Sequence, residues 1–564
     1  MKTTTFLLAL ILISFFASAQ VAPNKYFIRF TDKNNSPYSI DNPSEFLSQR
    51  AIDRRSNQDI PVEISDLPVN PSYLQGIAGT GAVILNPSKW LNGVSIFTDN
   101  PSVIDAIAEL PYVKSITKMP QPVLRPVISK LPAVKPFFKN EIYREVGPNL
   151  KQGREISSFD YGNGFNQIHM LNGDALHDMG YRGQGKVIAV LDGGFYHVNT
   201  LPVFDSLWQN NQILGTHDFV NGGEVTFDGA THGAMVLSCM GGNYPGELIG
   251  TAPKASFWLL ISEDVNSEYI LEEYNWVSAA EFADSVGADV INSSLGYTEF
   301  DDPVQNHTYA EMDGNTCPST IGADLAAKKG ILVVNSLGNS GSDDWYYLSA
   351  PSDGDSVLGI GAVDADGNYA SFSSHGPSYD GRVKPDVCAQ GEFDYVVDPY
   401  GGGFTYGSGT SFSSPVMAGA ATCLWQANPT LKNMQIADAI RESANQYNSP
   451  DGMLGYGIPD FILANNILTI VEGPAAANPA IKVYPNPFTE GFTIDAGKRG
   501  IGEAGMNSKI EISDITGRII LSQKVNHANS STITIDGLHH APKGMYFVKI
   551  NLNGELFQQK IVKD

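Results

Sequence analysis

The chain has 564 residues, of which 42% are hydrophobic and 17% charged, and its formal net charge is −24. This length suggests roughly three or four folding units, and the 56 glycines and 33 prolines indicate many turns rather than a helical bundle. The negative charge argues against a nucleic-acid partner, because phosphate binding needs clustered lysine and arginine, and it suits an exported protein that stays dispersed.

The first 19 residues have the three parts of a secretory signal peptide. Lys2 gives a positive start, an apolar run follows from Phe6 to Phe16, and Ala17-Ser18-Ala19 has the small residues of a cleavage site. The alternative is a membrane anchor, but the run is shorter than the roughly 20 apolar residues that span a bilayer. We therefore expect residues 1–19 to be removed and the mature protein to have no transmembrane segment.

Short strands and helices alternate through residues 26–118. Strands are expected at 26–30, 82–85 and 94–97, and helices at 46–55 and 101–110. Their β-α-β-β-α-β order is the ferredoxin-like α+β pattern. Residues 119–150 hold six prolines and read as an exposed linker, so residues 20–150 are expected to form one small domain with its linker.

Apolar runs separated by helical segments characterise residues 151–472. The runs lie at 187–191, 257–261, 290–291 and 331–334. Continuous apolar strands of this kind predict an α/β domain with a doubly wound parallel sheet covered on both faces. Ligands and catalytic groups of such sheets lie at the carboxyl ends of the strands.

The last part of the chain has a different spacing of predicted elements. Residues 473–480 read as a second linker, and short strands then recur at 510–512, 518–521, 532–535 and 546–550 with turn residues between them. This spacing predicts a small β-sandwich over residues 481–564.

Two ionisable residues lie at positions where the predicted sheet would place catalytic groups. Asp192 directly follows the strand at 187–191, and His232 precedes an apolar helical run. By themselves they have ordinary explanations, since Asp192 would also cap a strand-to-helix turn and His232 would also serve as a surface histidine.

Ser411 and Asn339 add a nucleophile and an amide donor. Ser411 would open a helix, whose N-terminal N–H groups suit a developing oxyanion, although a serine there is also a common helix cap. Asn339 follows the strand at 331–334, and its side chain could donate to the same oxyanion, although Asn-Ser-Gly also makes a plain turn.

Taken together, these segments resemble the subtilisin-like serine proteases, or subtilases, over about residues 160–470. The blocks Val187–Gly194, His232–Val236 and Gly409–Pro415 occur in the order Asp, His, Ser of that family. Gly338-Asn339 resembles the oxyanion block. Supporting similarity comes from further segments: Gly250–Pro253, Asn292–Gly296, Ala370–Pro377 and Gly381–Val387.

The resemblance implies a secreted endopeptidase with a triad of Asp192, His232 and Ser411, in which Asn339 helps to hold the oxyanion. It also implies that Ser294-Leu295-Gly296 pairs with the substrate main chain as an added strand. The chain departs from the family pattern at two positions, since Gly193 and Ala234 stand where hydroxyl residues are usual.

The two flanking regions resemble known modules as well. Residues 21 to about 150 resemble a subtilase propeptide, which implies a zymogen whose propeptide assists folding and inhibits the enzyme until self-cleavage. The C-terminal block resembles the sorting domain of type IX secretion through Val483–Phe488, Asp514–Arg518, Gly544–Lys549 and Gln559–Lys563. This implies export across the outer membrane, to the medium or the cell surface. An adhesion or carbohydrate-binding sandwich is the alternative.

Two other functions compete with the protease. An α/β-hydrolase esterase needs its histidine after its serine, and the only later histidines, at 527, 539 and 540, lie in the C-terminal block. A catalytically weak binding protein that keeps the fold would explain Gly193 and Ala234. Peptide or protein substrates and a monomer are expected, with cleavage preference left open.

No cofactor is expected to take part in the chemistry, and no metal ligands are predicted. The chain has neither a His-Glu-x-x-His motif nor a C-x-x-C spacing, so a zinc protease or zinc site is not indicated. Structural calcium is common in the family, and acidic loops at Asp301-Asp302, Asp313 and Asp343-Asp344 could bind it. Cys239 and Cys423 are expected to be buried free thiols, while disulfide pairing stays open.

Overall fold

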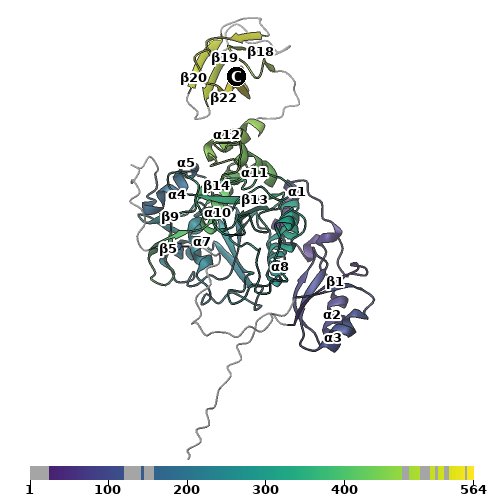
Figure 1. Ribbon diagram of the computed structural model, residues 1–564. Helices are drawn as coiled ribbons and strands as arrows, with labels where there is room; N and C mark the ends of the chain where they lie inside the picture. The colour runs from purple at the N-terminus through teal and green to yellow at the C-terminus, as the bar shows by residue number, and fades with distance from the viewer. Residues whose placement is uncertain are drawn as a thin grey trace, which may run out of the picture.

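The computed structural model describes most of the chain but not its ends and linkers. The described residues are 24–119, 142–144, 158–472, 482–495, 508–514, 519–525, 532–552 and 555–563. The expected signal peptide at 1–19, the linker at 473–480 and most of the linker at 119–150 lie outside them. Figure 1 shows the helices and strands of the described parts.

The N-terminal region, residues 24–119, is a four-stranded antiparallel sheet with helices. Its strands β1 (Lys25–Phe30), β2 (Val83–Ser88), β3 (Gly93–Phe97) and β4 (Val113–Lys118) have the order β2-β3-β1-β4. This is the strand order of the ferredoxin-like pattern predicted from the sequence. Two helices, not one, join the first two strands: α1 (Gln49–Asn57) and α2 (Pro71–Gly79); α3 (Pro101–Ala108) precedes the last.

The start of α1 differs from the expected start at residue 46. Ser48 has extended backbone angles, and its hydroxyl accepts a hydrogen bond from the Ala51 N–H at 3.2 Å. This is the geometry of a helix N-cap, so the helix begins only at Gln49.

The central domain, residues 158–472, is built on a seven-stranded parallel sheet. Its strand order is β14-β13-β12-β11-β6-β10-β7, and every neighbouring pair is parallel. The strands are β6 (Val187–Asp192), β7 (Ile213–Asp218), β10 (Ser256–Ile261), β11 (Val290–Ser293), β12 (Leu332–Ser336), β13 (Val357–Val363) and β14 (Val387–Gln390). The sequence predicted four of these strands and missed β7, β13 and β14.

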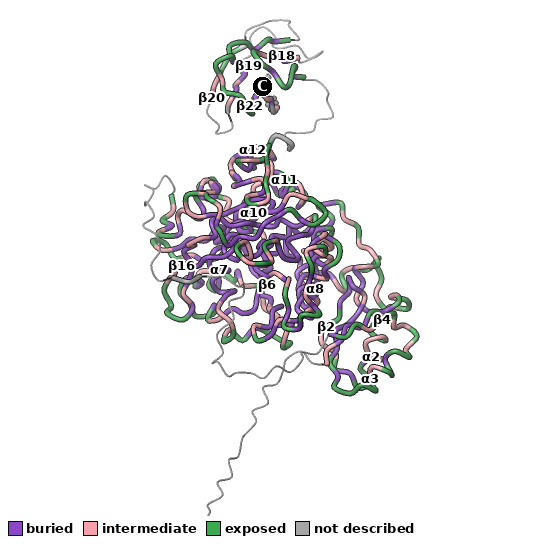
Figure 2. The backbone as a smooth tube through the Cα atoms, in the orientation of Figure 1, coloured by how far each residue is buried: buried purple, intermediate pink, exposed green. Residues whose placement is uncertain are grey.

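Helices cover both faces of this sheet (Figure 1), as the buried runs require. Ile188 and Val190 of β6 pack with α7 (His232–Gly241) and α10 (Thr410–Ala427) in one apolar cluster. Val187, Ala189 and Leu191 pack with α8 (Leu271–Val286) and α9 (Pro318–Lys328) in another. Figure 2 shows the buried backbone concentrated in this middle layer. The doubly wound α/β architecture is confirmed.

Shorter elements complete the central domain. They are the helices α4 (Phe165–His169), α5 (Gly173–Asp178), α6 (Asp205–Gln209), α11 (Asn433–Glu442) and α12 (Phe461–Glu472), the pair β8 (Asn243–Tyr244) and β9 (Leu248–Ile249), and the hairpin β15 (Asp394–Val397) and β16 (Phe404–Ser408), which β5 (Ile142–Arg144) joins. Within the described residues, no helix is both long enough and apolar enough to cross a bilayer.

The C-terminal region has two antiparallel sheets, of order β17-β18-β21 and β20-β19-β22-β23. The strands are β17 (Lys482–Tyr484), β18 (Phe492–Asp495), β19 (Ser508–Asp514), β20 (Ile519–Val525), β21 (Thr532–Ile535), β22 (Gly544–Leu552) and β23 (Glu555–Lys563). Alternate residues of both sheets, such as Ile494, Ile512 and Val548, share one apolar cluster. A small sandwich follows from this alternation, as predicted.

Candidate active site

The predicted site residues meet at one edge of the central sheet. Asp192 is the last residue of β6, and His232 and Ser411 lie in the first turns of α7 and α10. All three are buried. Because β6 lies beside β11 in the middle of the sheet, the carboxyl ends of these strands bring Asp192 and the segment after Ser293 to the same edge.

A carboxylate–imidazole pair is formed at this edge. His232 Nδ1 lies 2.9 Å from both Asp192 Oδ1 and Oδ2, and the Gly193 N–H donates to Oδ1 at 2.8 Å. Gly233 makes this approach possible, since a Cβ there would come within 2.5 Å of the Gly194 carbonyl oxygen. With Nδ1 facing Asp192, the tautomer is fixed and Nε2 is the nitrogen that can accept a proton.

Ser411 lies in the first turn of α10, beside this histidine. The rings of His232 and Phe412 are 6.1 Å apart between centroids. The Ser411 hydroxyl is buried and has no hydrogen-bond partner among the residues that the structure describes. A hydroxyl in this state is available for reaction, and hydrogen bonds of a nucleophile often tighten only when substrate binds.

Pro415 explains how α10 is tied to the neighbouring segment. A proline has no N–H, so the carbonyl four residues earlier, that of Ser411, loses its helical donor. The Ser294 hydroxyl donates to this carbonyl at 2.9 Å. Ser294 therefore replaces the missing helical hydrogen bond and links the segment after β11 to Ser411.

Asn339 is also held against the start of α10. Its Oδ1 accepts hydrogen bonds from the Thr410 N–H and the Thr410 hydroxyl, both at 2.8 Å. Thr410 in turn accepts a hydrogen bond from the Gly338 N–H at 3.2 Å. These contacts assign the amide orientation, because only the oxygen can accept, so Nδ2 is the donor end of the side chain.

The segment Ser294-Leu295-Gly296 lies at the same edge. Leu295 is buried in the apolar cluster beneath α8, and its carbonyl accepts a hydrogen bond from Asn335 Nδ2 at 3.0 Å. Gly296 is only partly buried. Hydrogen bonds thus link Asp192 with His232 and Ser294 with Ser411, whereas the Ser411 hydroxyl makes no hydrogen bond with His232.

A buried acid pair near this edge was not predicted. Burial raises the pKa of Glu263, and the negative charge of Asp192 adds to the rise. Burial and the charge of Glu263 raise the pKa of Glu272 as well. The Tyr297 hydroxyl donates to Glu263 at 3.2 Å. The signal in the sequence was an acidic residue close behind the strand at 257–261.

The two departures from the family pattern leave the pair intact. At position 193 a backbone N–H contacts Asp192, as described above, and at position 234 the alanine is fully buried in the apolar cluster of α7 and α10. Neither position therefore leaves a polar group of the pair exposed to water. The 2.9 Å contact between Asp192 and His232 persists without the two hydroxyls.

The N-terminal region docks on α8 through buried charges. Asp284 of α8 contacts three cations of that region: Arg54 at 2.6 Å, Arg55 at 2.8 Å and Lys89 at 3.0 Å. These cations hold the pKa of the Asp284 carboxyl well below its usual range, although burial alone would raise it. One turn earlier, Glu281 accepts hydrogen bonds from the backbone N–H groups of Lys89 and Trp90.

The acidic loops considered for calcium use their carboxylates locally. Asp313 Oδ1 accepts from the Asn315 and Thr316 N–H groups, and Asp302 Oδ1 accepts from the Val304 N–H. Such contacts are typical of Asx turns. Among the described residues, these loops do not belong to the groups of side chains that could hold a metal ion, so calcium there stays a prediction.

Comparisons with known proteins give three family matches. Residues 183–457 match the subtilase family, residues 25–130 match the peptidase S8 propeptide domain of Bacteroidota, and residues 482–564 match the secretion system C-terminal sorting domain. The three matched stretches correspond to the three regions of the structure.

Among individual proteins, subtilisin DY of Bacillus licheniformis is 30% identical over 280 residues, covering 49% of this chain and 90% of its own length. Subtilisin of Bacillus pumilus is 30% identical over 288 residues, covering 50% and 92%. Subtilisin E of Bacillus subtilis is also 30% identical over 283 residues, and the chain spans 65% of its length.

One solved structure extends the similarity in fold. Fervidolysin of Fervidobacterium pennivorans, described as a keratinolytic enzyme related to subtilisin, aligns with a TM-score of 0.52 at 17% identity. The alignment covers 94% of this chain and 71% of that one. At this identity the match bears on the fold alone.

Proposed function

The chain belongs to the subtilase family, and on that premise we propose that it is a serine endopeptidase with the triad Asp192, His232 and Ser411. The 2.9 Å contact between the Asp192 carboxylate and His232 Nδ1 is the observation that supports this assignment most directly. A buried serine hydroxyl at the start of the neighbouring helix supplies the nucleophile.

The proposed reaction proceeds through an acyl-enzyme. The Ser411 hydroxyl oxygen attacks the carbon of the scissile carbonyl, and its proton passes to His232 Nε2. His232 then gives this proton to the leaving amine, and the C–N bond breaks. A water molecule repeats the sequence on the ester, giving its proton to His232 and releasing the carboxylate product. Asp192 stays ionised and stabilises the imidazolium.

The negative charge on the attacked oxygen needs donors that are already in place. The Ser411 N–H, in the first turn of α10, has no helical acceptor of its own and would supply one donor. Asn339 Nδ2 would supply the other, held by the two contacts of its oxygen to Thr410. Loss of one such side-chain donor costs about 2.7–4 kcal/mol in the barrier, a range measured in a subtilisin.

Substrate would lie along Ser294-Leu295-Gly296 as an added strand. Because the Ser294 hydroxyl donates to the Ser411 carbonyl, this segment and the nucleophile are held in one frame. The proposed substrates are proteins or peptides. The proposed reaction uses only side chains and backbone groups of one chain, and we propose that the enzyme works as a monomer.

The flanking regions support production as an exported zymogen. The N-terminal region matches a propeptide domain and docks on α8 through Asp284. The C-terminal region matches a secretion sorting domain. We infer that the first inhibits the enzyme until cleavage and that the second directs export by the type IX machinery, to the medium or the cell surface.

A single substitution tests the proposed chemistry. Ser411→Ala cannot mature by self-cleavage, so wild type and variant are both freed of the N-terminal region by an added protease and repurified. The variant should then lose both peptide hydrolysis and labelling by a fluorophosphonate probe, because both need the same oxygen. Ser413→Ala is the matched control, since that buried hydroxyl on the same helix donates to the Thr410 carbonyl at 3.1 Å. Undiminished hydrolysis by the Ser411 variant would refute the assignment. A wild-type protein that neither cleaves nor labels would favour a binding protein, and ester-only cleavage an esterase.

A further inference from the structure

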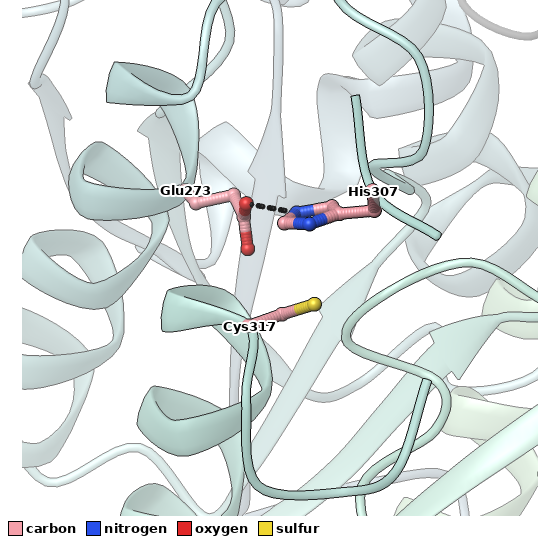
Figure 3. A group of neighbouring side chains, drawn as sticks. All are labelled: Glu273, His307 and Cys317. Carbon is pink, nitrogen blue, oxygen red and sulfur yellow. Dashed lines mark hydrogen bonds and ion pairs between the residues drawn. The ribbon is translucent and has the colours of Figure 1, made fainter. Parts of the chain in front are cut away.

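Three buried side chains converge in the central domain apart from the triad. Glu273 of α8, His307 of the segment between β11 and α9, and Cys317, which directly precedes α9, point toward one another (Figure 3). One ligand-type atom from each lies within 4.8 Å of the others, and all three residues are buried. The mechanism proposed above uses none of them.

Each of the three side chains is oriented by further contacts. Glu273 Oε1 lies 2.6 Å from His307 Nε2, while its Oε2 accepts hydrogen bonds from the Ser319 N–H at 3.0 Å and the Ser319 hydroxyl at 2.6 Å. His307 Nδ1 is 3.9 Å from the Glu311 carboxylate. Outer partners of this kind fix the rotamer and ring orientation of ligands in metal sites.

Cys317 occupies the N-cap position of α9, and its Sγ donates to the Glu311 carbonyl at 3.5 Å. The N-terminal end of a helix favours a negative charge, so this position suits a thiolate once a cation is near. Thiolate and carboxylate together would carry two negative charges. A divalent cation would neutralise them, which matters because the cluster has little contact with water.

We propose that Glu273, His307 and Cys317 form a binding site for zinc, with water in the fourth position. Sulfur, imidazole nitrogen and carboxylate oxygen are the three ligand types of protein zinc sites, and the thiolate disfavours calcium and magnesium. Tetrahedral zinc would set neighbouring ligand atoms about 3.3–3.6 Å apart. The Glu273–His307 contact would therefore open by about 1 Å or less, and the sulfur would move inward.

A metal here would anchor the segment that follows the proposed substrate-binding residues. The His307 N–H donates to the Thr298 carbonyl at 2.8 Å, two residues after Gly296, and Tyr297 exchanges hydrogen bonds with Ala350. Zinc would join this segment to α8 and to the start of α9. We therefore assign the site a structural role.

The test uses the full chain carrying Ser411→Ala, so that self-cleavage does not interfere. After loading with zinc chloride and gel filtration, the protein should retain one zinc per chain. Titration with Co²⁺ should produce a thiolate-to-cobalt charge-transfer band, a signature that a carboxylate site cannot give. Cys317→Ser should abolish the band and weaken zinc binding by about 100-fold or more, since even outer-partner substitutions cost 10–100-fold.

Cys388→Ser is the matched control, because Cys388 is equally buried and its Sγ donates to a backbone carbonyl at the same 3.5 Å distance. It should keep the band and the zinc. The cobalt titration of the protein with Cys317 intact tests the site by itself. A folding defect in Cys317→Ser would therefore leave the proposal testable. Absence of bound zinc and of the band would overturn it, as would a band that survives in Cys317→Ser.

Discussion

Acidification should destabilise the central domain through the buried imidazole of His177. Its Nε2 lies 3.0 Å from the Thr251 carbonyl, which can only accept, so Nε2 carries the hydrogen. Nδ1 is then the acceptor for the Tyr161 hydroxyl at 2.7 Å. A second proton on Nδ1 would make the Tyr161 hydroxyl turn to accept it and would place a charge in a buried site, so burial favours the neutral ring.

The size of the effect follows from the pKa of His177. Burial lowers this pKa from 6.5 to about 4. In the unfolded chain the imidazole would bind its proton near pH 6.5, so the unfolded state gains protons first as the pH falls. The stabilisation is complete above pH 6.5 and is lost progressively down to about pH 4. A difference of about 2.5 pH units corresponds to about 3 kcal/mol of unfolding free energy.

The comparison needs a variant that cannot titrate. His177→Gln offers a donor and an acceptor but stays neutral, and it would be measured in the Ser411→Ala background to prevent self-cleavage. The free energy of unfolding of the central domain would be measured with urea at several pH values between about 7.5 and 4. Over this range it should decrease by about 3 kcal/mol more for the protein with His177 than for the His177→Gln variant. Parallel curves for the two proteins would refute the proposed cause, as would an NMR titration of His177 near pH 6.5.

Three further outcomes follow from other contacts. Ser294→Ala should leave the Ser411 carbonyl without a donor, at a cost of about 1–3 kcal/mol, and should lower kcat more than it raises KM in peptide assays; an unchanged kcat would contradict this. Asp284→Asn should weaken docking of the N-terminal region by about 3–5 kcal/mol, seen as earlier release of the cleaved propeptide on gel filtration, whereas Asp53→Asn on the exposed side of α1 should not. Truncation after Pro479 should trap the protein in the periplasm, and normal export would reject the sorting role.

Periodicity predicted the buried strands well because both faces of the sheet are covered. β6 begins with five consecutive apolar residues and β12 with three, and the positions after these runs gave Asp192 and the region of Asn339 directly. β7, by contrast, reads Ile-Leu-Gly-Thr-His-Asp and lies at the edge of the sheet, so its pattern is mixed. α2 was missed because two glycines dilute its helical signal.

Contacts between distant segments could not be predicted from any local pattern. The basic end of the helix near residue 55 was visible in the sequence, but its partner Asp284 lies 229 residues further along the chain. The same holds for Glu273, His307 and Cys317, whose spacing matches no metal-binding motif and which meet only because α8, α9 and the intervening segment pack together. The resemblance pointed to Ser294, whereas its hydrogen bond to the Ser411 carbonyl joins residues 117 positions apart and has no local sequence signal.

The sulfur chemistry of this chain bears on its durability. All four cysteines are buried free thiols, as expected for Cys239 and Cys423, and no disulfide links them. Burial raises the pKa of Cys239, Cys388 and Cys423, which keeps them as slow-reacting thiols. An exported enzyme of this kind would need no disulfide formation to mature, and an added reductant would not lower its stability by breaking a disulfide. Its lifetime in aerated medium would depend on how rarely local unfolding exposes these buried thiols to peroxide.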